Sequence, residues 1–316
     1  MQNRGRKQPL PADLSRVRTV RLGGRASKVV ASDLSARPRK GVSFASFEKG
    51  LPKLLAVREF RALADALASA ARGRKTVLWM CGAHVIKTGL SLVLIELMER
   101  GALTALALNG AGAIHDFEIA LAGKTSEDVL KGLKNGSFGM ARETGEFFAR
   151  ALRRYGAEGY GSAVGRVIDE EKLPYRKLSL LWNCRRLGLS STVHVAIGTD
   201  ITHQQPGARG EDIGRASFED FRRICGVVGT LEGGVVVNVG SAVIMPEVFL
   251  KALTVARNLG HRVRKFTAAN LDMIQQYRPR MNVVERPTAL GGRPIQLTGH
   301  HELMVPLLAQ AVLERL

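Results

Sequence analysis

The sequence contains few cysteines and no long hydrophobic run. Its 316 residues include 3 cysteines, Cys81, Cys184 and Cys225, which form no CxxC pair. Widely spaced, unpaired thiols are typical of reduced cysteines, so we expect a cytoplasmic protein without a disulfide framework. Apolar stretches such as residues 92–97 are far shorter than the roughly 20 residues of a membrane span. We therefore expect no membrane-spanning helix.

Acidic residues are scarce relative to basic ones, and most of the imbalance lies near the N-terminus. The formal net charge is +19, and residues 1–80 contribute +13 of it, from 18 Lys and Arg against 5 Asp and Glu. Residues 1–50 contain no apolar signal-peptide stretch and are rich in Arg, Pro, Gly and Ser. We predict an extended basic arm there, with a short strand over residues 17–22.

Three roles suit a basic arm of this kind. It can bind nucleic acid or acidic lipid, act as a solubilising tail, or lie across an acidic neighbouring subunit. The arm has no interleaved aromatic residues and no RNA-binding or zinc-finger pattern, which favours the last two roles.

The rest of the chain alternates between β-like runs and helical patterns. We predict strands over residues 76–81, 103–108, 193–197, 234–239 and 263–267, and helices over 54–71, 86–100, 114–121, 140–154, 218–228, 246–258 and 303–316. The glycine-rich stretch 156–177 is predicted to be irregular, and 125–128 has the form of a helix start. This alternation predicts a single α/β domain over residues 51–316, with a Rossmann-like, mostly parallel sheet covered by helices on both faces.

Small and polar residues follow the predicted strands. Because ligands bind beyond the carboxyl ends of parallel strands, these residues predict one shared pocket. Five of the seven histidines lie in these segments: His84, His115, His203, His300 and His301. We predict that proton transfer falls to His115, His203 or His300.

Individual motifs in these segments remain open to two interpretations. The turn over residues 109–113 cradles a phosphate or forms a tight strand–helix turn, and His115 replaces the third glycine of a dinucleotide fingerprint. Asp116 and Glu118 either pair with His115 for proton transfer or simply favour the start of a helix. Lys87 starts a helix, where a cation is disfavoured, so a ligand or acidic partner would explain it better.

A zinc site is the main alternative to this interpretation. His203, His300, His301, Asp116 and Glu302 supply enough ligand atoms for Zn²⁺, and would make the protein a metal-dependent hydrolase or lyase. However, the sequence has no HxH, HxxxH or HExxH spacing, so such ligands would come from distant segments. Nucleophile motifs of the GxSxG type are also missing.

Taken in order, several segments resemble the deoxyhypusine synthase family, from about residue 76 to the C-terminus. The similar segments are residues 86–90, 110–114, Asp200, 231–236, 267–272 and 306–308. The resemblance implies a Rossmann-like homotetramer with NAD and substrate sites at subunit interfaces. In that family NAD takes a hydride from spermidine, and an enzyme lysine carries the aminobutyl group to a protein lysine.

By position, the resemblance also implies roles for the pocket residues. Carboxylates on the substrate side suit a polyamine. The resemblance places Ala83, Gly110, Ala111, Gly112, Gly234, Thr267 and His300 along the cofactor groove, and we add Asn109, Gly233, Ser241 and Asn270 as candidate cofactor-binding residues. It places Asp116, Asp200 and Asp272 on the substrate side, and we add His84, Glu118, Asn238, His301 and Glu302 as candidate substrate-binding residues.

The sequence departs from the family at the residues that carry its chemistry. Glu285, Arg286 and Pro287 stand where the family has its Trp-Gly-Lys carrier lysine, and Asn238 stands where it has a histidine. His300 replaces an aspartate near the last helix. Without the carrier lysine, covalent imine transfer cannot proceed as in the family, and Lys87 is the one lysine of the predicted pocket available to replace it. We therefore predict an NAD-binding enzyme acting on an amine or other small polar substrate, with chemistry other than deoxyhypusine synthesis.

Overall fold

Six parallel strands form the centre of the computed structural model, which describes residues 10–316. The strands are β1 (Val77–Cys81), β2 (Ala105–Asn109), β3 (Ser190–His194), β4 (Val235–Val239), β5 (Thr267–Asp272) and β6 (Arg293–Thr298). Their order is β3-β2-β1-β4-β5-β6, and every neighbouring pair is parallel. This is the doubly wound order of a Rossmann-like fold, which confirms the predicted fold class.

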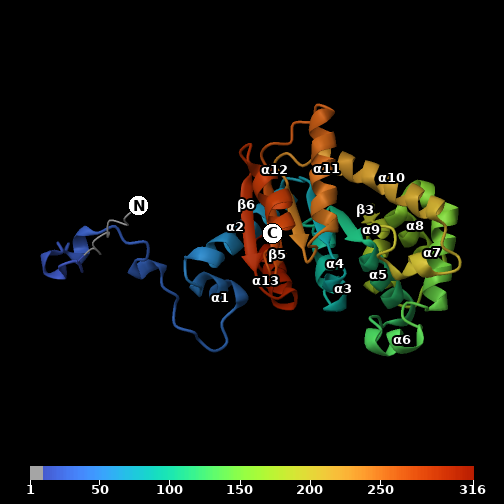
Figure 1. Cartoon of the computed structure of the whole chain (residues 1–316), viewed down its shortest axis with the longest axis horizontal. Helices are drawn as coiled ribbons and strands as arrows, with labels where there is room; N and C mark the ends of the chain where they lie inside the picture. Colours follow the sequence, from blue (N-terminus) through green and yellow to red (C-terminus); the bar gives the residue numbers. More distant parts are fainter. Residues whose placement is uncertain (1–9) are drawn as a thin grey trace, which may run out of the picture.

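Helices cover both faces of the sheet, so its central strands are buried on both sides (Figure 1). In β1, Val77, Trp79 and Cys81 belong to one hydrophobic core, whereas Leu78 and Met80 belong to the other. Alternate side chains of a strand point to opposite faces, which is why the strand is apolar at every position. The larger core packs against α2 (Leu55–Arg72), α4 (Ser91–Glu99), α5 (Gly110–Ala122), α7 (Arg142–Tyr155), α8 (Tyr160–Glu170), α9 (Leu180–Arg186) and α13 (His301–Leu313). The smaller core packs against α11 (Ile244–Asn258), η7 (Pro279–Glu285) and the second half of α10 (Gly210–Gly229).

The prediction of an irregular stretch over residues 156–177 is wrong. Half of it forms α8, which is buried along one side. A Cβ at Gly161 would lie 2.7 Å from the Ser191 carbonyl oxygen, and one at Gly165 would lie 2.6 Å from that of Leu181. These glycines therefore let the helix approach β3 and α9 closely, and do not mark a loop.

Several predicted boundaries also need correction. The predicted helix over residues 86–100 is two helices, α3 (His84–Lys87) and α4, separated at Gly89, whose φ is +79°. The strand predicted over 263–267 begins only at Thr267, and β6 was not predicted because its first residues are exposed. The helix start predicted at 125–128 is α6 (Val129–Asn135), capped by Asp128 rather than Thr125.

The N-terminal segment extends away from the body (Figure 1). Residues 10–43 are almost entirely exposed and form only the short turns Leu14–Arg16, Leu22–Gly24 and Ala31–Asp33. The strand predicted over 17–22 does not form, because no strand lies beside it to share hydrogen bonds. Residues 1–9 of the predicted arm lie outside the described residues. In the part described, no helix is both long and apolar enough to cross a membrane.

The short helix α1 (Phe44–Gly50) joins this segment to the body through a buried carboxylate. Glu48 accepts hydrogen bonds from Nη1 and Nη2 of Arg315, at 2.8 and 2.6 Å. These bonds, together with the charges of Arg315 and Arg61, lower the pKa of Glu48 despite its burial. A bidentate pair of this kind fixes both position and orientation.

Candidate functional site

A cavity of about 210 Å³ opens at the carboxyl edge of the sheet, where the chain leaves β2 and β3. Its size suits a small molecule, since it is below the range of roughly 300–1,000 Å³ found for drug-sized ligands. The lining residues are Lys87, Ala111, Ile114, His115, Glu118, Ser126, Glu127, Val129, Phe138, Thr199, Asp200 and Ile201. Five of them, Lys87, Ala111, His115, Glu118 and Asp200, were predicted from the sequence.

Asp200 lies over the first turn of α5. A Cβ at Gly110 would lie 1.9 Å from Asp200 Oδ2, and the backbone N–H of Ala111 donates to the carboxylate. The Asp200 side chain is 6% exposed, and Oδ2 is buried without a hydrogen-bond partner in residues 10–316. Burial raises the pKa of Asp200 to about 6, although the Ala111 bond opposes the shift. Asp200 is therefore a buried acid with one oxygen still able to accept a hydrogen bond.

His203 lies beside this carboxylate, with Nε2 at 3.8 Å from Asp200 Oδ2. Its Nδ1 accepts from the backbone N–H groups of Gly198 and Asp200, at 3.1 and 3.3 Å. Since Nδ1 is an acceptor, the proton of the neutral ring is on Nε2. Burial lowers the pKa of His203, which also favours the neutral ring.

His115 is the centre of a second hydrogen-bonded group. Its Nδ1 lies 2.6 Å from Thr125 Oγ1, and the Thr125 hydroxyl donates to Glu118. Because the only hydroxyl proton goes to Glu118, Thr125 must accept from Nδ1–H, which leaves Nε2 of neutral His115 unprotonated. Burial would raise the pKa of Glu118, but bonds from His115 and Thr125 lower it overall. His115 thus has the form of a general base held by a threonine and a carboxylate.

Thr125 was not predicted as a site residue, because the sequence of residues 125–128 resembles a helix start. Glu127, also in this segment, lines the pocket and accepts from the Gly139 backbone N–H at 2.8 Å. The pocket therefore contains three carboxylates, on Glu118, Glu127 and Asp200, with Lys87 exposed at the rim.

Asp116 does not belong to this pocket. It is fully buried and accepts from Ser179 Oγ at 2.6 Å and from the backbone N–H groups of Leu180 and Leu181. Burial raises its pKa to about 6 against these bonds. Its carboxylate caps the N-terminus of α9, a structural role in place of the predicted substrate contact.

A second group of predicted residues lies where β1, β4 and β5 end. The rings of His84 and His301 are 5.5 Å apart, and His301 Nε2 lies 3.2 Å from the Leu271 carbonyl oxygen and 3.9 Å from Asp272 Oδ1. His301 Nδ1 is buried without a partner in the described chain. Ala83 and Ser241 lie at the same strand ends, and Ser241 Oγ accepts from the Met245 N–H at 3.2 Å. This is the point where the strand order reverses, the usual ligand crevice of such sheets.

Other predicted residues near this crevice are either buried inside the protein or exposed to solvent. The Asn238 side-chain amide donates to Asn270 Oδ1 at 2.7 Å and to the Ser241 carbonyl at 3.0 Å, and both asparagines are completely buried. They bridge β4 and β5 and do not face a cavity. His300 and Glu302 are largely exposed at the start of α13, with 3.8 Å between Nδ1 and Oε1.

Three predicted cofactor residues lie at the opposite edge of the sheet. Gly233 and Gly234 precede β4, and Thr267 begins β5, so all three are at amino ends of strands. A Cβ at Gly234 would lie 2.2 Å from the Thr76 carbonyl oxygen. Close packing against the start of β1 explains that glycine, and the predicted contact of these residues with a ligand in the crevice is wrong.

The phosphate-cradle interpretation of residues 109–113 is also not supported. Asn109 Oδ1 accepts from the Gly112 N–H at 2.9 Å, and the Ala111 N–H is bound to Asp200. The first turn of α5 is therefore already capped by two side chains, one of them a carboxylate that would repel a phosphate. A dinucleotide phosphate does not fit at Asn109, Gly110, Ala111 and Gly112.

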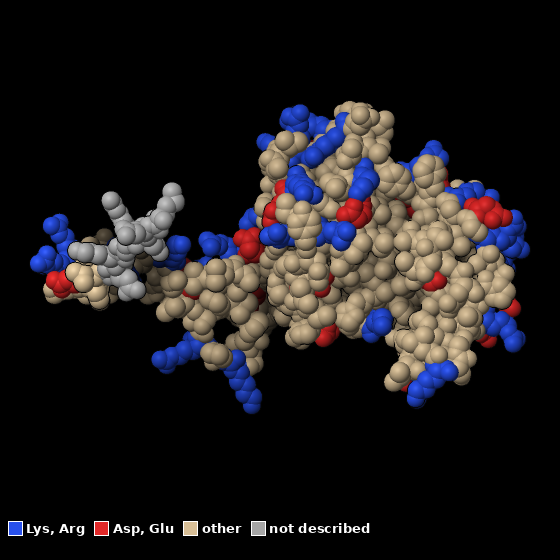
Figure 2. All heavy atoms as spheres, viewed as in Figure 1, with Lys and Arg blue, Asp and Glu red and all other residues tan. Residues whose placement is uncertain are grey.

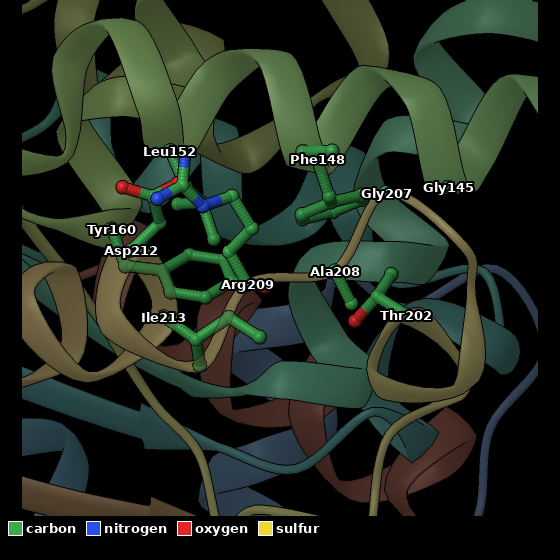
Figure 3. Close-up of a pocket in the computed structure, with 11 residues that line it drawn as sticks. Gly145, Phe148, Leu152, Tyr160, Thr202, Gly207, Ala208, Arg209, Asp212 and Ile213 are labelled. Carbon is green, nitrogen blue, oxygen red and sulfur yellow. The ribbon is translucent and has the colours of Figure 1, made fainter.

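A much smaller cavity, of about 10 Å³, lies between α7 and the start of α10 (Figure 3). Tyr160, Thr202 and Asp212 are among its lining residues. This volume holds about one water molecule, so the cavity is not a substrate site. Among residues 10–316, no three His, Cys, Asp or Glu side chains are grouped to hold a metal ion, and the predicted zinc ligands lie apart.

No protein-family model and no curated protein sequence matches the chain. Among solved structures, AgrE in a ternary complex with ornithine and NAD+ aligns with a TM-score of 0.50 and 16% identity, over 81% of this chain and 33% of that chain. A candidate LOR/SDH protein from Methanococcus maripaludis S2 aligns with a TM-score of 0.50 and 15% identity, over 90% of this chain and 73% of that chain. A candidate deoxyhypusine synthase from Entamoeba histolytica aligns with a TM-score of 0.48 and 10% identity, over 87% of this chain and 94% of that chain.

These alignments define the class of protein as a Rossmann-like α/β protein with the fold of AgrE and the LOR/SDH protein. The chain spans about one third of the length of the AgrE structures it matches. The specific relation to deoxyhypusine synthase, the homotetramer and its interface sites stay predictions.

Proposed function

We propose that this chain is an enzyme that binds a small substrate through a positively charged nitrogen in the cavity of about 210 Å³ described above, which we therefore call the amine pocket. The observation that carries the proposal is the buried Asp200 carboxylate, which lines the pocket and whose Oδ2, packed against Gly110, has no partner in the described residues. An ammonium or guanidinium group would supply both the hydrogen bond and the opposite charge. Glu118 and Glu127 add to the negative potential of the same wall.

In this proposal His115 accepts the proton that the substrate loses. Thr125 and Glu118 hold its ring so that Nε2 carries the lone pair, and the Glu118 carboxylate stabilises the imidazolium that forms. Lys87 at the rim would bind an anionic group at the other end of an amino-acid substrate. AgrE, solved with ornithine and NAD+, is a protein of this fold that binds such an amino acid.

We further propose NAD as the cofactor, bound at the crevice between β1 and β4 and not at the glycine-rich turn after β2. His84 and Ser241 border this crevice, and the unpartnered His301 Nδ1 is an acceptor that fits a ligand donor such as a carboxamide or hydroxyl. When bound, NAD supplies hydride transfer.

Titration calorimetry with charged and uncharged probes tests the proposal. Ornithine and spermidine should bind to the wild-type protein, whereas succinate and glycerol, which carry no positively charged nitrogen, should not. Asp200→Asn should weaken the cationic probes about 10- to 100-fold, the loss expected for a charge-assisted hydrogen bond of about 1.5–3 kcal/mol. Asp169→Asn, an exposed acid away from the pocket, is the matched control and should bind as the wild type does.

Equal binding of ornithine to wild type and Asp200→Asn, or equal binding of succinate and ornithine to the wild type, would overturn the substrate proposal. The cofactor proposal has its own readout, because NAD+ at about 100 times its Kd should stabilise the fold by about 2.7 kcal/mol. If NAD+ gives no thermal shift while ornithine does, the cofactor proposal is wrong and the pocket proposal stands.

A further inference from the structure

A strongly basic hollow lies at the amino edge of the sheet, opposite the amine pocket. It has a volume of about 620 Å³ and lies between the end of α11 and the start of β5. Its lining residues are Arg257, Gly260, His261, Arg262, Val263, Arg264 and Leu290. Figure 2 shows Lys and Arg side chains gathered over this end of the body, around α11 and α12 (Arg286–Thr288).

The hollow has more positive than negative charge, since one neighbouring carboxylate, that of Glu232, acts on Arg257 and Arg262. No Asp or Glu lines it. The carboxylate of Glu232, which lies beside it, accepts from the backbone N–H groups of Arg264 and Lys265, at 2.6 and 2.9 Å. Within residues 10–316, none of the three lining arginines has a carboxylate oxygen within 4 Å. Arg100 and Arg222, by contrast, pair with Glu96 and Glu219.

Arg257 is the fixed member of the cluster. Its Nε donates to the Val263 carbonyl at 2.9 Å, and its Nη2 donates to the Pro287 carbonyl at 3.0 Å. Burial lowers the pKa of Arg257, and the positive charge of Arg264 lowers it further. The arginines therefore repel one another while one of them is anchored in place, an arrangement that an anion would stabilise.

We propose that this hollow is a binding site for a ligand that carries two or more phosphate groups. Planar guanidinium groups match phosphate oxygens in pairs, and three of them converge here around a concave surface. The lining contains no Phe, Tyr or Trp, and its charged groups are arginines, so we expect the ligand to be bound mainly through its phosphates. It shares no residue with the amine pocket, and so stands independently of the function proposed above.

Binding of inorganic tripolyphosphate to the full chain, measured by calorimetry, tests this site. The double variant Arg262→Ala/Arg264→Ala removes two exposed charges and should weaken binding about 10-fold or more. The control Arg100→Ala/Arg222→Ala removes the same net charge at ion-paired positions elsewhere, and should change binding less than about 2-fold. Circular dichroism of both variants checks that they remain folded.

A second probe, a short single-stranded RNA, distinguishes the source of the phosphates. RNA binding that falls in the site variant and is competed by tripolyphosphate supports the site with nucleic acid as its ligand. If tripolyphosphate binds and RNA does not, and the binding depends on the same arginines, the site is supported and its ligand is a small phosphorylated molecule. An equal loss in the site and control variants, or no binding of either probe to the wild type, overturns the proposal.

Discussion

The Asp200 carboxylate occupies the space that a side chain at Gly110 would need. A Cβ at Gly110 would lie 1.9 Å from Oδ2 and 2.6 Å from Cγ of Asp200. The carboxylate therefore contacts the first turn of α5 directly, and the glycine is required for this contact rather than for binding a phosphate. The position of the Asp200 carboxylate in the pocket therefore depends on the first turn of α5.

Gly110→Ala should displace Asp200 and destabilise the fold by about 1–3 kcal/mol, the usual cost of overpacking a close contact. It should also abolish binding of cationic probes. Gly226→Ala is the control, because Gly226 lies within α10 with nothing within 4 Å of its Cβ position. That variant should be neutral or up to about 1 kcal/mol more stable. Chemical denaturation measures both, and equal stability of the two variants would contradict the contact.

The raised pKa of Asp200 makes a prediction about pH. Its folded-state pKa is about 6 and its ordinary value is 3.8, so the folded protein loses stability as pH rises from about 4 through 6. This shift corresponds to roughly 3 kcal/mol. Asp200→Asn lacks this loss, so its stability relative to wild type should increase with pH over that range while its affinity for amines falls. A constant difference between the two proteins from about pH 4 to 7.5 would show that Asp200 is not a buried acid.

His115, which lines the amine pocket, and His203, which lies beside Asp200, should have opposite neutral tautomers. The hydrogen bonds described above place the proton of His115 on Nδ1 and that of His203 on Nε2. Long-range ¹H–¹⁵N NMR spectra distinguish the two forms. Thr125→Val should remove the bond that fixes His115 and change its tautomer, without changing that of His203. Identical tautomers in the wild type would refute the assignment of His115 as a base.

Much of this arrangement was predictable from the sequence, because strand ends of a parallel sheet meet at one edge. Lys87, His115 and Asp200 come from three different strand–helix connections, and the sheet order brings them to one cavity. Helical geometry also separates Asp116 from Glu118, which the sequence prediction grouped together. Residues two apart point to different sides of a helix, so Glu118 faces the pocket with His115, whereas Asp116 faces α9.

Other features could not be obtained from local pattern. Thr125 resembles a helix cap, and its contact with His115 depends on how the chain turns back after α5. Gly161 and Gly165 have the composition of a loop, but their role depends on β3 and α9, which are distant in sequence. Residues 263–267 were predicted as a strand, and only the fold shows that Arg262 and Arg264 line a hollow together with Arg257.

The most direct test is a crystal structure of the protein soaked with ornithine. The account predicts that the ligand's ammonium group lies in the amine pocket within about 3 Å of Asp200 Oδ2, with His115 Nε2 facing the adjacent carbon. Ornithine bound elsewhere on the chain, or in this pocket with its carboxylate toward Asp200, would contradict it.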